Sequence, residues 1–279
     1  MPYTAEINRS NPSCFIFLID QSGSMGDPFG TGESTKTKAE GLADAINRIL
    51  QNLVIKCAKS EGVYDYFHVG VIGYGTHVTS AFSGPLSSRD LVPVSEIATS
   101  PSRIESRTKK VEDGAGGLVE QSVKFPVWFE PVANGGTPMC QAFSRAKTIL
   151  EGWLKDHGSC FPPVIIHLTD GESTDGDPSA LAMALRDLKV DDGNVLLFNV
   201  HLSSQRAMPI TFADSEANLP DQYAKLLFSM SSHLPDYMRQ LAHQSGFPVS
   251  ENTRGFAFNA DLSTVIQFLT IGTQPSNLR

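Results

Sequence analysis

Oxygen-bearing side chains recur at alternate positions in one short run near the start of the chain, Asp20-Gln21-Ser22-Gly23-Ser24. The run follows an apolar segment, residues 14–19, that is typical of a buried strand. Alternate residues of an extended segment point to the same side, so the Asp20 carboxylate and the Ser22 and Ser24 hydroxyls face one way. Such oxygens are ligands for hard cations. The run therefore predicts one part of a cation site at the end of a strand.

Two later stretches carry oxygen donors in similar surroundings. Gly135-Gly136-Thr137-Pro138 places a hydroxyl where a helix is expected to begin at Pro138. Ile165-Ile166-His167-Leu168-Thr169-Asp170-Gly171 is an apolar strand that ends on a carboxylate. In a doubly wound sheet, ligands bind beyond the carboxyl ends of the strands, where the order of connections reverses. If the strands ending at Asp20 and Asp170 are neighbours, five side chains converge there: Asp20, Ser22, Ser24, Thr137 and Asp170.

The segments that must position these residues alternate between strand and helix patterns, which predicts an α/β fold with a mostly parallel sheet covered by helices on both faces. Thr37-Lys38-Ala39-Glu40 has the form of a capping box at the start of a long amphipathic helix. We expect strands at 14–19, 66–74, 163–169, 195–200 and 255–259, and helices at about 37–54, 138–154, 177–188, 223–229, 237–245 and 262–270.

One compact domain, residues 1–279, accounts for the chain. At 41% hydrophobic residues it is long enough to bury a sizeable core. Two segments, 77–132 and 203–235, are expected to be elaborations of that domain, since the first has too few apolar residues for a core of its own.

Composition also limits the partners. With 22 basic and 30 acidic residues, the net charge of −8 argues against a nucleic acid or an anionic membrane as the main partner. The N-terminus lacks the pattern of a signal peptide, and no apolar run approaches the roughly 20 residues of a membrane helix. The cysteines lack metal-ligand spacing and are expected to be reduced small hydrophobes: Cys14, Cys57, Cys140 and Cys160. We therefore expect a soluble cytoplasmic protein.

The ordered pattern Asp20-x-Ser22-x-Ser24, Thr137 and Asp170 resembles the metal-ion-dependent adhesion site (MIDAS) of von Willebrand factor type A (vWA) domains. The resemblance covers most of the chain and matches all five positions. It implies a Rossmann-like sheet of about six strands with helices on both faces. It also implies a bound divalent cation that captures an acidic group of a partner. Mg²⁺ is the expected ion, with Mn²⁺ and Ca²⁺ as alternatives.

The residue types explain why such a site would bind a partner. Hydroxyls ligate a cation without cancelling its charge, and the two matched carboxylates, Asp20 and Asp170, can act through water. An Asp or Glu of another protein can then complete the shell. Gly135 and Gly136 would bring Thr137 close to the metal, and Thr137 is expected also to cap the following helix.

Two closing segments resemble bacterial tellurium-resistance-type proteins of the TerY group. They are Arg254-Gly255-Phe256-Ala257-Phe258-Asn259-Ala260-Asp261 and Phe268-Leu269-Thr270-Ile271-Gly272-Thr273. This resemblance implies an intracellular adaptor in a stress-response system, with a protein kinase and a PP2C-type phosphatase as partners.

Other functions remain open from the residues alone. Asp20 could be the nucleophile of a metal-dependent phosphoryl-transfer enzyme or hydrolase, although haloacid-dehalogenase-like phosphatases have a second acid where this chain has Ser22. Ser22 and Ser24 lack the Gly-x-Ser-x-Gly pattern of serine hydrolases. A purely structural interaction domain with an inactive site is a third alternative. Three acids after Asp170 are interpreted as turn, capping or supporting groups: Glu172, Asp175 and Asp177.

Overall fold

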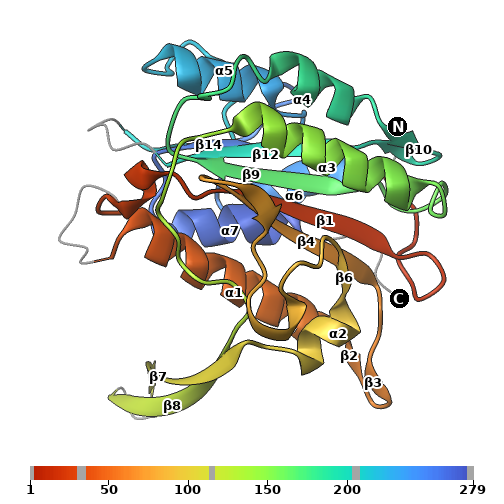
Figure 1. Cartoon of the computed structure of the whole chain (residues 1–279), viewed down its shortest axis with the longest axis vertical. Helices are drawn as coiled ribbons and strands as arrows, with labels where there is room; N and C mark the ends of the chain where they lie inside the picture. The colour runs from red at the N-terminus through yellow and green to blue at the C-terminus, as the bar shows by residue number, and fades with distance from the viewer. Residues whose placement is uncertain (1–2, 30–35, 113–116, 203–207, 275–279) are drawn as a thin grey trace.

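A mostly parallel sheet forms the centre of the protein. The computed structural model describes residues 3–29, 36–112, 117–202 and 208–274, and the structural statements below concern these residues. The strand order is β13-β14-β12-β9-β1-β4-β5, with β6 also paired to β4 (Figure 1). The parallel strands are β1 (Ser13–Asp20), β4 (Phe67–Tyr74), β9 (Val164–Thr169), β12 (Leu196–His201) and β14 (Phe256–Phe258).

Three short antiparallel strands extend this sheet to eight strands: β5 (Val78–Ser80), β6 (Val92–Pro93) and β13 (Ile210–Thr211). The predicted α/β class with a mostly parallel sheet is therefore confirmed, and the count of about six strands is wrong. Strands of two or three residues carry too little periodicity to be recognised in a sequence.

The order of connections reverses beside β1. The chain leaves β1 for β4 on one side and later returns to β9 on the other side, and both neighbours run parallel to β1. The Cα register pairs Asp20 with Tyr74 on β4 and Ile19 with Leu168 on β9. Asp20 and the end of β9 consequently lie at the same edge of the sheet, as the sequence predicts.

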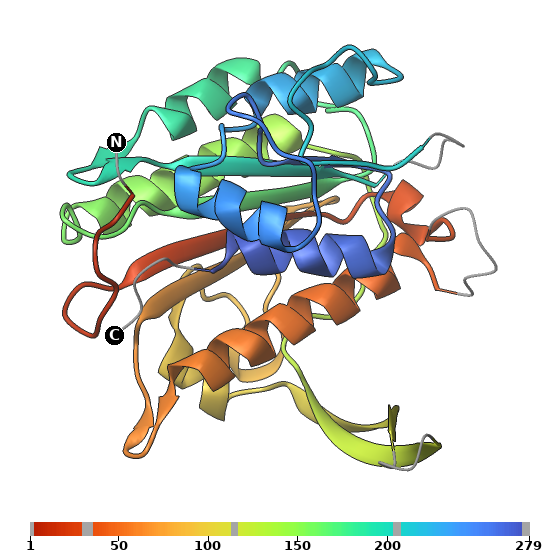
Figure 2. The ribbon, with the colours of Figure 1, turned by 180° about the vertical axis from the view of Figure 1, so that it is seen from behind.

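Helices cover both faces of the sheet (Figures 1 and 2). One face carries α1 (Lys38–Cys57), α6 (Asp236–Gln244) and α7 (Leu262–Gly272), and the other carries α3 (Met139–Leu154), α4 (Ser179–Arg186) and α5 (Gln222–Met230). Along β1, Phe15, Phe17 and Ile19 join the first core and Cys14, Ile16 and Leu18 join the second. Because both faces are covered, β1 is apolar at nearly every position until it reaches Asp20.

The segment 77–132 contains more regular structure than its sequence indicates. After β5 come a 3₁₀ turn (Gly84–Leu86), β6 and the short helix α2 (Val94–Thr99). The strands β7 (Arg103–Glu112) and β8 (Leu118–Val127) then pair as an antiparallel hairpin that projects from the body (Figures 1 and 2). At its base, Asn47 Oδ1 accepts a hydrogen bond from Trp128 N at 2.8 Å. The hairpin was not predicted, because its charged residues mask the alternation of a strand.

The remaining elements are small. Two short hairpins pair β2 (Ala58–Lys59) with β3 (Gly62–Val63) and β10 (Lys189–Val190) with β11 (Gly193–Asn194). The second elaboration contains β13 and α5, close to the helix expected at 223–229, while residues 203–207 lie outside the described residues. None of the helices in the described part of the chain combines the length and apolar character needed to cross a membrane.

Candidate metal centre

The loops that carry the predicted ligands are bonded to one another. Gly23 N, in the loop after β1, donates a hydrogen bond to Gly135 O at 3.1 Å, and Asn134 N donates to Gln21 O at 2.6 Å. The loop before α3 is therefore held directly against the loop after β1. This arrangement brings the Asp20-x-Ser22-x-Ser24 run and Thr137 to one place, although more than 110 residues of sequence lie between them.

The loop after β9 holds Thr137 from the other side. Thr137 N donates to Thr174 Oγ1 at 3.0 Å, and Thr174 N donates to Thr137 O at 2.9 Å. A Cβ atom placed on Gly171 would lie 3.7 Å from Thr137 Oγ1, so the Thr137 hydroxyl is directed toward the Asp170–Gly171 turn. All three loops thus meet at the edge formed by β1 and β9.

Glycine is required where the loops approach most closely. Gly135 has φ +92°, and a Cβ atom there would lie 2.4 Å from Thr76 N. A Cβ atom on Gly75 would lie 2.5 Å from Asn134 O. Any larger residue at either position would push the loops apart. These distances support the predicted role of Gly135 in bringing Thr137 close to the other loops. Glycine is less strictly required at Gly136, where the nearest atom to an added Cβ would be Thr174 Oγ1 at 3.2 Å.

Hydrogen bonds connect four of the five predicted ligands. Asp20 Oδ1 accepts from Ser22 N at 2.8 Å, and Ser22 Oγ lies 3.1 Å from Ser24 Oγ. Ser24 Oγ donates to Asp170 Oδ1 at 2.7 Å, which links the loop after β1 to the end of β9. Asp20 Oδ2 accepts from Thr169 Oγ1 at 2.7 Å. The predicted oxygens therefore form one cluster, with the Thr137 hydroxyl beside it.

The Asp20 carboxylate is buried with little to offset its charge. Its exposed fraction is 1%, and burial raises its pKa to about 6. Hydrogen bonds from Thr169 and Ser22 act in the opposite direction, and the nearby negative charge of Asp170 adds to the increase. Among the described residues, no cationic side chain forms a salt bridge with Asp20. A divalent cation would supply the missing positive charge.

Asp170 has a cationic partner that was not predicted. Its buried carboxylate accepts from Lys38 Nζ at 2.7 Å through Oδ2, and the Lys38 side chain is 3% exposed. From the sequence, Lys38 was interpreted only as part of the capping box. That interpretation is correct for its neighbours, since Thr37 caps α1 and forms the reciprocal box with Glu40. The positive end of the helix dipole disfavours a lysine in the first turn of a helix. The position of Lys38 in the sequence therefore indicates that it pairs with a carboxylate.

The donor set fits a hard divalent cation. Three hydroxyls and two carboxylates converge, and no group of three or more His, Cys, Asp or Glu side chains with metal-binding geometry occurs among the described residues. Oxygen donors with few charges suit Mg²⁺ or Mn²⁺, which retain waters in their coordination shell. Ligation by these five residues remains a prediction that their placement supports.

The acids that follow Asp170 have supporting roles. Asp175 accepts hydrogen bonds from Cys140 N at 2.9 Å and Gln141 N at 3.0 Å, and so caps the start of α3 from another loop. Asp177 accepts from Ser179 N at 2.9 Å at the start of α4. The expectation that Thr137 caps α3 is wrong, because Pro138 occupies the N-cap position and no side-chain cap is made from it. Asp175 satisfies the amides in its place.

A hollow of about 750 Å³ lies beside Thr137, whose neighbours Gly136 and Pro138 line it, although none of the five predicted ligands does. Its walls come from the loop after β4, the loop before α3 and the loop after β9: Gly75, Thr76, His77, Val78, Thr79, Gly135, Gly136, Pro138, Gln141, Thr174 and Asp175.

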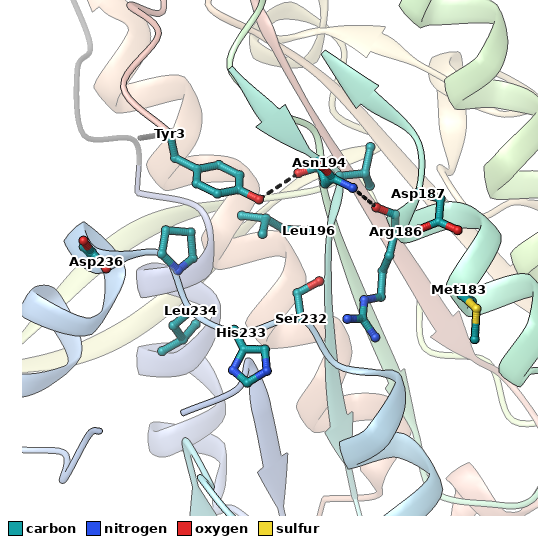
Figure 3. Close-up of a pocket in the computed structure, with 12 residues that line it drawn as sticks. Tyr3, Met183, Arg186, Asp187, Asn194, Leu196, Ser232, His233, Leu234 and Asp236 are labelled. Carbon is teal, nitrogen blue, oxygen red and sulfur yellow. Dashed lines mark hydrogen bonds between the residues drawn. The ribbon is translucent and has the colours of Figure 1, made fainter. Parts of the chain in front are cut away.

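A second hollow, of about 530 Å³, contains none of the predicted site residues (Figure 3). It lies near Leu196, where β12 begins, and so at the opposite end of the strands from the candidate metal centre. Tyr3 Oη donates to Asn194 O at 3.3 Å on one wall. On another wall, Arg186 donates to the carbonyls of Ser229 and Met230 at the end of α5. Arg186 therefore satisfies carbonyl groups at the C-terminal end of α5.

The chain matches no protein-family model and no curated protein. Among solved structures, proximal thread matrix protein 1 from the mussel byssus, with a zinc-occupied MIDAS motif, aligns over 96% of this chain and 48% of its own (13% identity, TM-score 0.47). The vWF domain of the type V pili tip protein Mfa5 from Porphyromonas gingivalis aligns over 58% and 39% (13% identity, TM-score 0.33). The adhesive tip pilin GBS104 from Group B Streptococcus agalactiae aligns over 59% and 46% (16% identity, TM-score 0.31). The chain thus spans less than half the length of each of these structures.

Proposed function

We propose that this protein is a vWA-type binding module that captures an acidic side chain of a partner protein through a divalent cation. The residues that would hold the cation are Asp20, Ser22, Ser24, Thr137 and Asp170. The observation that carries the proposal is the chain of contacts from Asp20 through Ser22 and Ser24 to Asp170, at the point where the sheet reverses its order of connections. A bound Mg²⁺ would supply a coordination position for a carboxylate oxygen.

The residues around the cluster favour binding over catalysis. Both oxygens of Asp20 are engaged by hydrogen bonds, and the side chain is buried, so it is poorly placed to attack a phosphate ester. The Ser22 and Ser24 hydroxyls contact each other and Asp170, and neither is paired with a histidine in the hydrogen bonds of the described residues. A nucleophilic serine needs an adjacent base. These contacts support a recognition site that performs no reaction.

The cellular context is proposed from the sequence resemblance alone. The segments similar to the tellurium-resistance-type group form β14 and α7. On that basis we propose an intracellular bacterial adaptor that associates with a protein kinase and a PP2C-type phosphatase. Co-purification with such enzymes in the presence of Mg²⁺, and its loss in EDTA, would support metal-mediated capture. Equal retention under both conditions would contradict it.

The metal site can be tested by thermal unfolding with and without Mg²⁺ or Mn²⁺. A ligand at 100 times its Kd stabilises the native state by about 2.7 kcal/mol. We expect a rise in Tm for the wild type that is lost in Asp20→Asn, which keeps the shape of the side chain and removes its charge.

Asp236→Asn is the matched control for that experiment. It makes the same chemical change at a side chain that is 86% exposed and pairs with Arg239 on α6. Its metal-dependent rise in Tm should equal that of the wild type. A wild type with no response to either ion, or an Asp20→Asn variant with an undiminished response, would refute the site.

A further inference from the structure

Lys38 places a positive charge inside the candidate metal centre. Its ammonium lies 2.7 Å from Asp170 Oδ2 and 3.9 Å from Asp27 Oδ2. The Asp170 side chain is fully buried, whereas that of Asp27 is 59% exposed. Asp170 is therefore the stronger partner, because water screens the exposed pair more effectively.

The surrounding structure holds this lysine in place. Lys38 is the first residue of α1, and its backbone N–H donates to Asp27 O at 2.9 Å. The capping box of Thr37 and Glu40 fixes the same turn. The helix end itself disfavours a cation there, so the pairing with Asp170 keeps the ammonium in an otherwise unfavourable position.

The pairing also engages the second oxygen of Asp170. Oδ1 accepts from Ser24 and Oδ2 accepts from Lys38. Each of these donors occupies one lone pair of the Asp170 carboxylate. A cation would bind that lone pair only after the donor had moved away. Lys38 thereby opposes the direct use of this carboxylate as a metal ligand.

We propose that Lys38 sets the balance between the two binding steps of the site, weakening the binding of the divalent cation and strengthening the subsequent capture of a carboxylate. This inference rests on the proposed function. The buried charges of the site, those of Asp20, Asp170 and Lys38, sum to a formal −1, which a divalent cation changes to +1; the exposed Asp27 carboxylate is screened by water and is not counted. Without the lysine, the same site would pass from −2 to 0. An approaching carboxylate therefore meets a positive centre in the wild type and a neutral one in its absence.

The first test measures Mn²⁺ affinity by isothermal titration calorimetry in the wild type and in Lys38→Met. We expect Lys38→Met to bind Mn²⁺ about 10-fold more tightly, since the substitution removes one positive charge that is paired with the predicted ligand Asp170. Lys38→Arg keeps the charge and should stay within about 2-fold of the wild type.

Lys36→Met is the matched control, with the same substitution and the same change in net charge two residues away. The Lys36 side chain is 51% exposed and pairs with Asp44 on the surface. Solvent screening should leave its Mn²⁺ affinity within about 2-fold of the wild type. Circular dichroism of each variant verifies folding before titration. Lys38→Gln, which also removes the charge but keeps a polar end group, takes the place of Lys38→Met if that variant fails to fold.

The second test adds acetate to the Mn²⁺-loaded proteins and follows the water-proton relaxation rate, which falls when a carboxylate displaces water from the ion. Acetate should bind Lys38→Met about 5- to 10-fold more weakly than the wild type, Lys38→Arg and Lys36→Met. Unchanged acetate affinity in Lys38→Met would overturn the second half of the inference.

The outcomes separate this inference from the proposed function. If the wild type binds Mn²⁺ and Lys38→Met binds it equally well, the inference is overturned while the metal site stands. If the wild type and every variant fail to bind Mn²⁺, both are overturned. If only Lys38→Met binds, the proposed function is overturned together with the second half of this inference, because the wild type would then hold no cation to capture a carboxylate.

Discussion

Two polar clusters lie along the same central strands and differ in how their hydrogen bonds and charges are balanced. The inner cluster is buried in the sheet, where His167 Nδ1 contacts Asn199 Oδ1 at 2.8 Å and its Nε2 forms a hydrogen bond with the Tyr74 hydroxyl. Asn199 Nδ2 in turn donates to Ser231 Oγ at 2.9 Å. The outer cluster is the candidate metal centre, which includes Asp170, three residues after His167 and just beyond the end of β9.

The difference between the clusters shows how polar residues of one strand acquire separate roles. The inner cluster consists of neutral groups that satisfy one another, and burial lowers the pKa of His167 to about 4 so that it stays neutral. The outer cluster contains the carboxylates of Asp20 and Asp170 and one ammonium, which is paired with Asp170, and it is therefore short of positive charge. A closed neutral network stabilises a fold, whereas an incompletely neutralised one attracts a cation.

The largest expected effect comes from breaking the inner cluster. His167→Leu removes the imidazole that bonds the buried Tyr74 hydroxyl and the Asn199 amide oxygen. A buried group that loses its partner costs 1–3 kcal/mol, and Thr169 still bonds Tyr74, so the free energy of unfolding should fall by about 3 kcal/mol. Urea denaturation measures this loss. The affinity for Mg²⁺ should stay within about 2-fold of the wild type, since the change leaves the outer cluster intact. A large loss of affinity would show that the two clusters act as one.

Acidification should act on the two clusters in opposite directions. His167 has a pKa of about 4 in the folded state against 6.5 when unfolded, so its contribution to stability is lost as the pH falls from about 6.5 to 4. Asp20 has a folded pKa of about 6 against 3.8, so in the metal-free protein its burial becomes less costly as the pH falls from about 6 to 3.8. The two contributions nearly cancel in the wild type.

Replacing Asp20 by Asn removes one of these two opposing contributions. The loss of stability that protonation of His167 causes should then become measurable. In EDTA, the unfolding free energy of Asp20→Asn should fall between pH 7 and pH 4.5 by about 2 kcal/mol more than that of the wild type. The measurement is urea unfolding at both pH values, with Asp236→Asn as the control for a generic loss of charge. An identical pH dependence in all three proteins would contradict the assigned shifts.

A smaller effect is expected at the contact between the sheet and the outer cluster. Thr169→Val keeps the shape of the side chain and removes the hydrogen bond to Asp20 Oδ2, which should cost about 2 kcal/mol at pH 7.5 because the bond is to a charged group. Thr169→Ser should recover most of this stability. Failure of the serine to do so would indicate that packing of the methyl group, and not the hydroxyl, stabilises β9.

The smallest effect on stability is expected at Thr137. Its backbone carries the loop contacts, so Thr137→Val should change the unfolding free energy by less than about 0.5 kcal/mol. The hydroxyl is a predicted metal ligand, and its loss should weaken Mg²⁺ binding by about 10-fold, or about 1.4 kcal/mol. Calorimetric titration measures the affinity, and Thr137→Ser should restore it. Unchanged affinity in Thr137→Val would remove Thr137 from the site.

Sequence reasoning was most successful where a long apolar pattern or a specific motif was present. The strands β1, β4, β9 and β12 and the long helices were predicted close to their observed positions, because elements buried on one or both faces carry strong periodicity. The β7–β8 hairpin was missed, since its charged residues hide a strand pattern and it projects away from the core. The candidate site was predicted from the order of its three motifs along the chain. This order can be recognised even when the residues are far apart in the sequence.

By itself, the sequence determined the class of fold, the chain order of the oxygen donors and their positions at the ends of elements. Those features depend on local periodicity and residue type. Only the tertiary structure decided that β1 and β9 are neighbours, that Asp175 caps α3 in place of Thr137, and that Lys38 pairs with Asp170. Each of these contacts joins residues at least 34 positions apart, and the choice among such partners depends on how the whole chain packs.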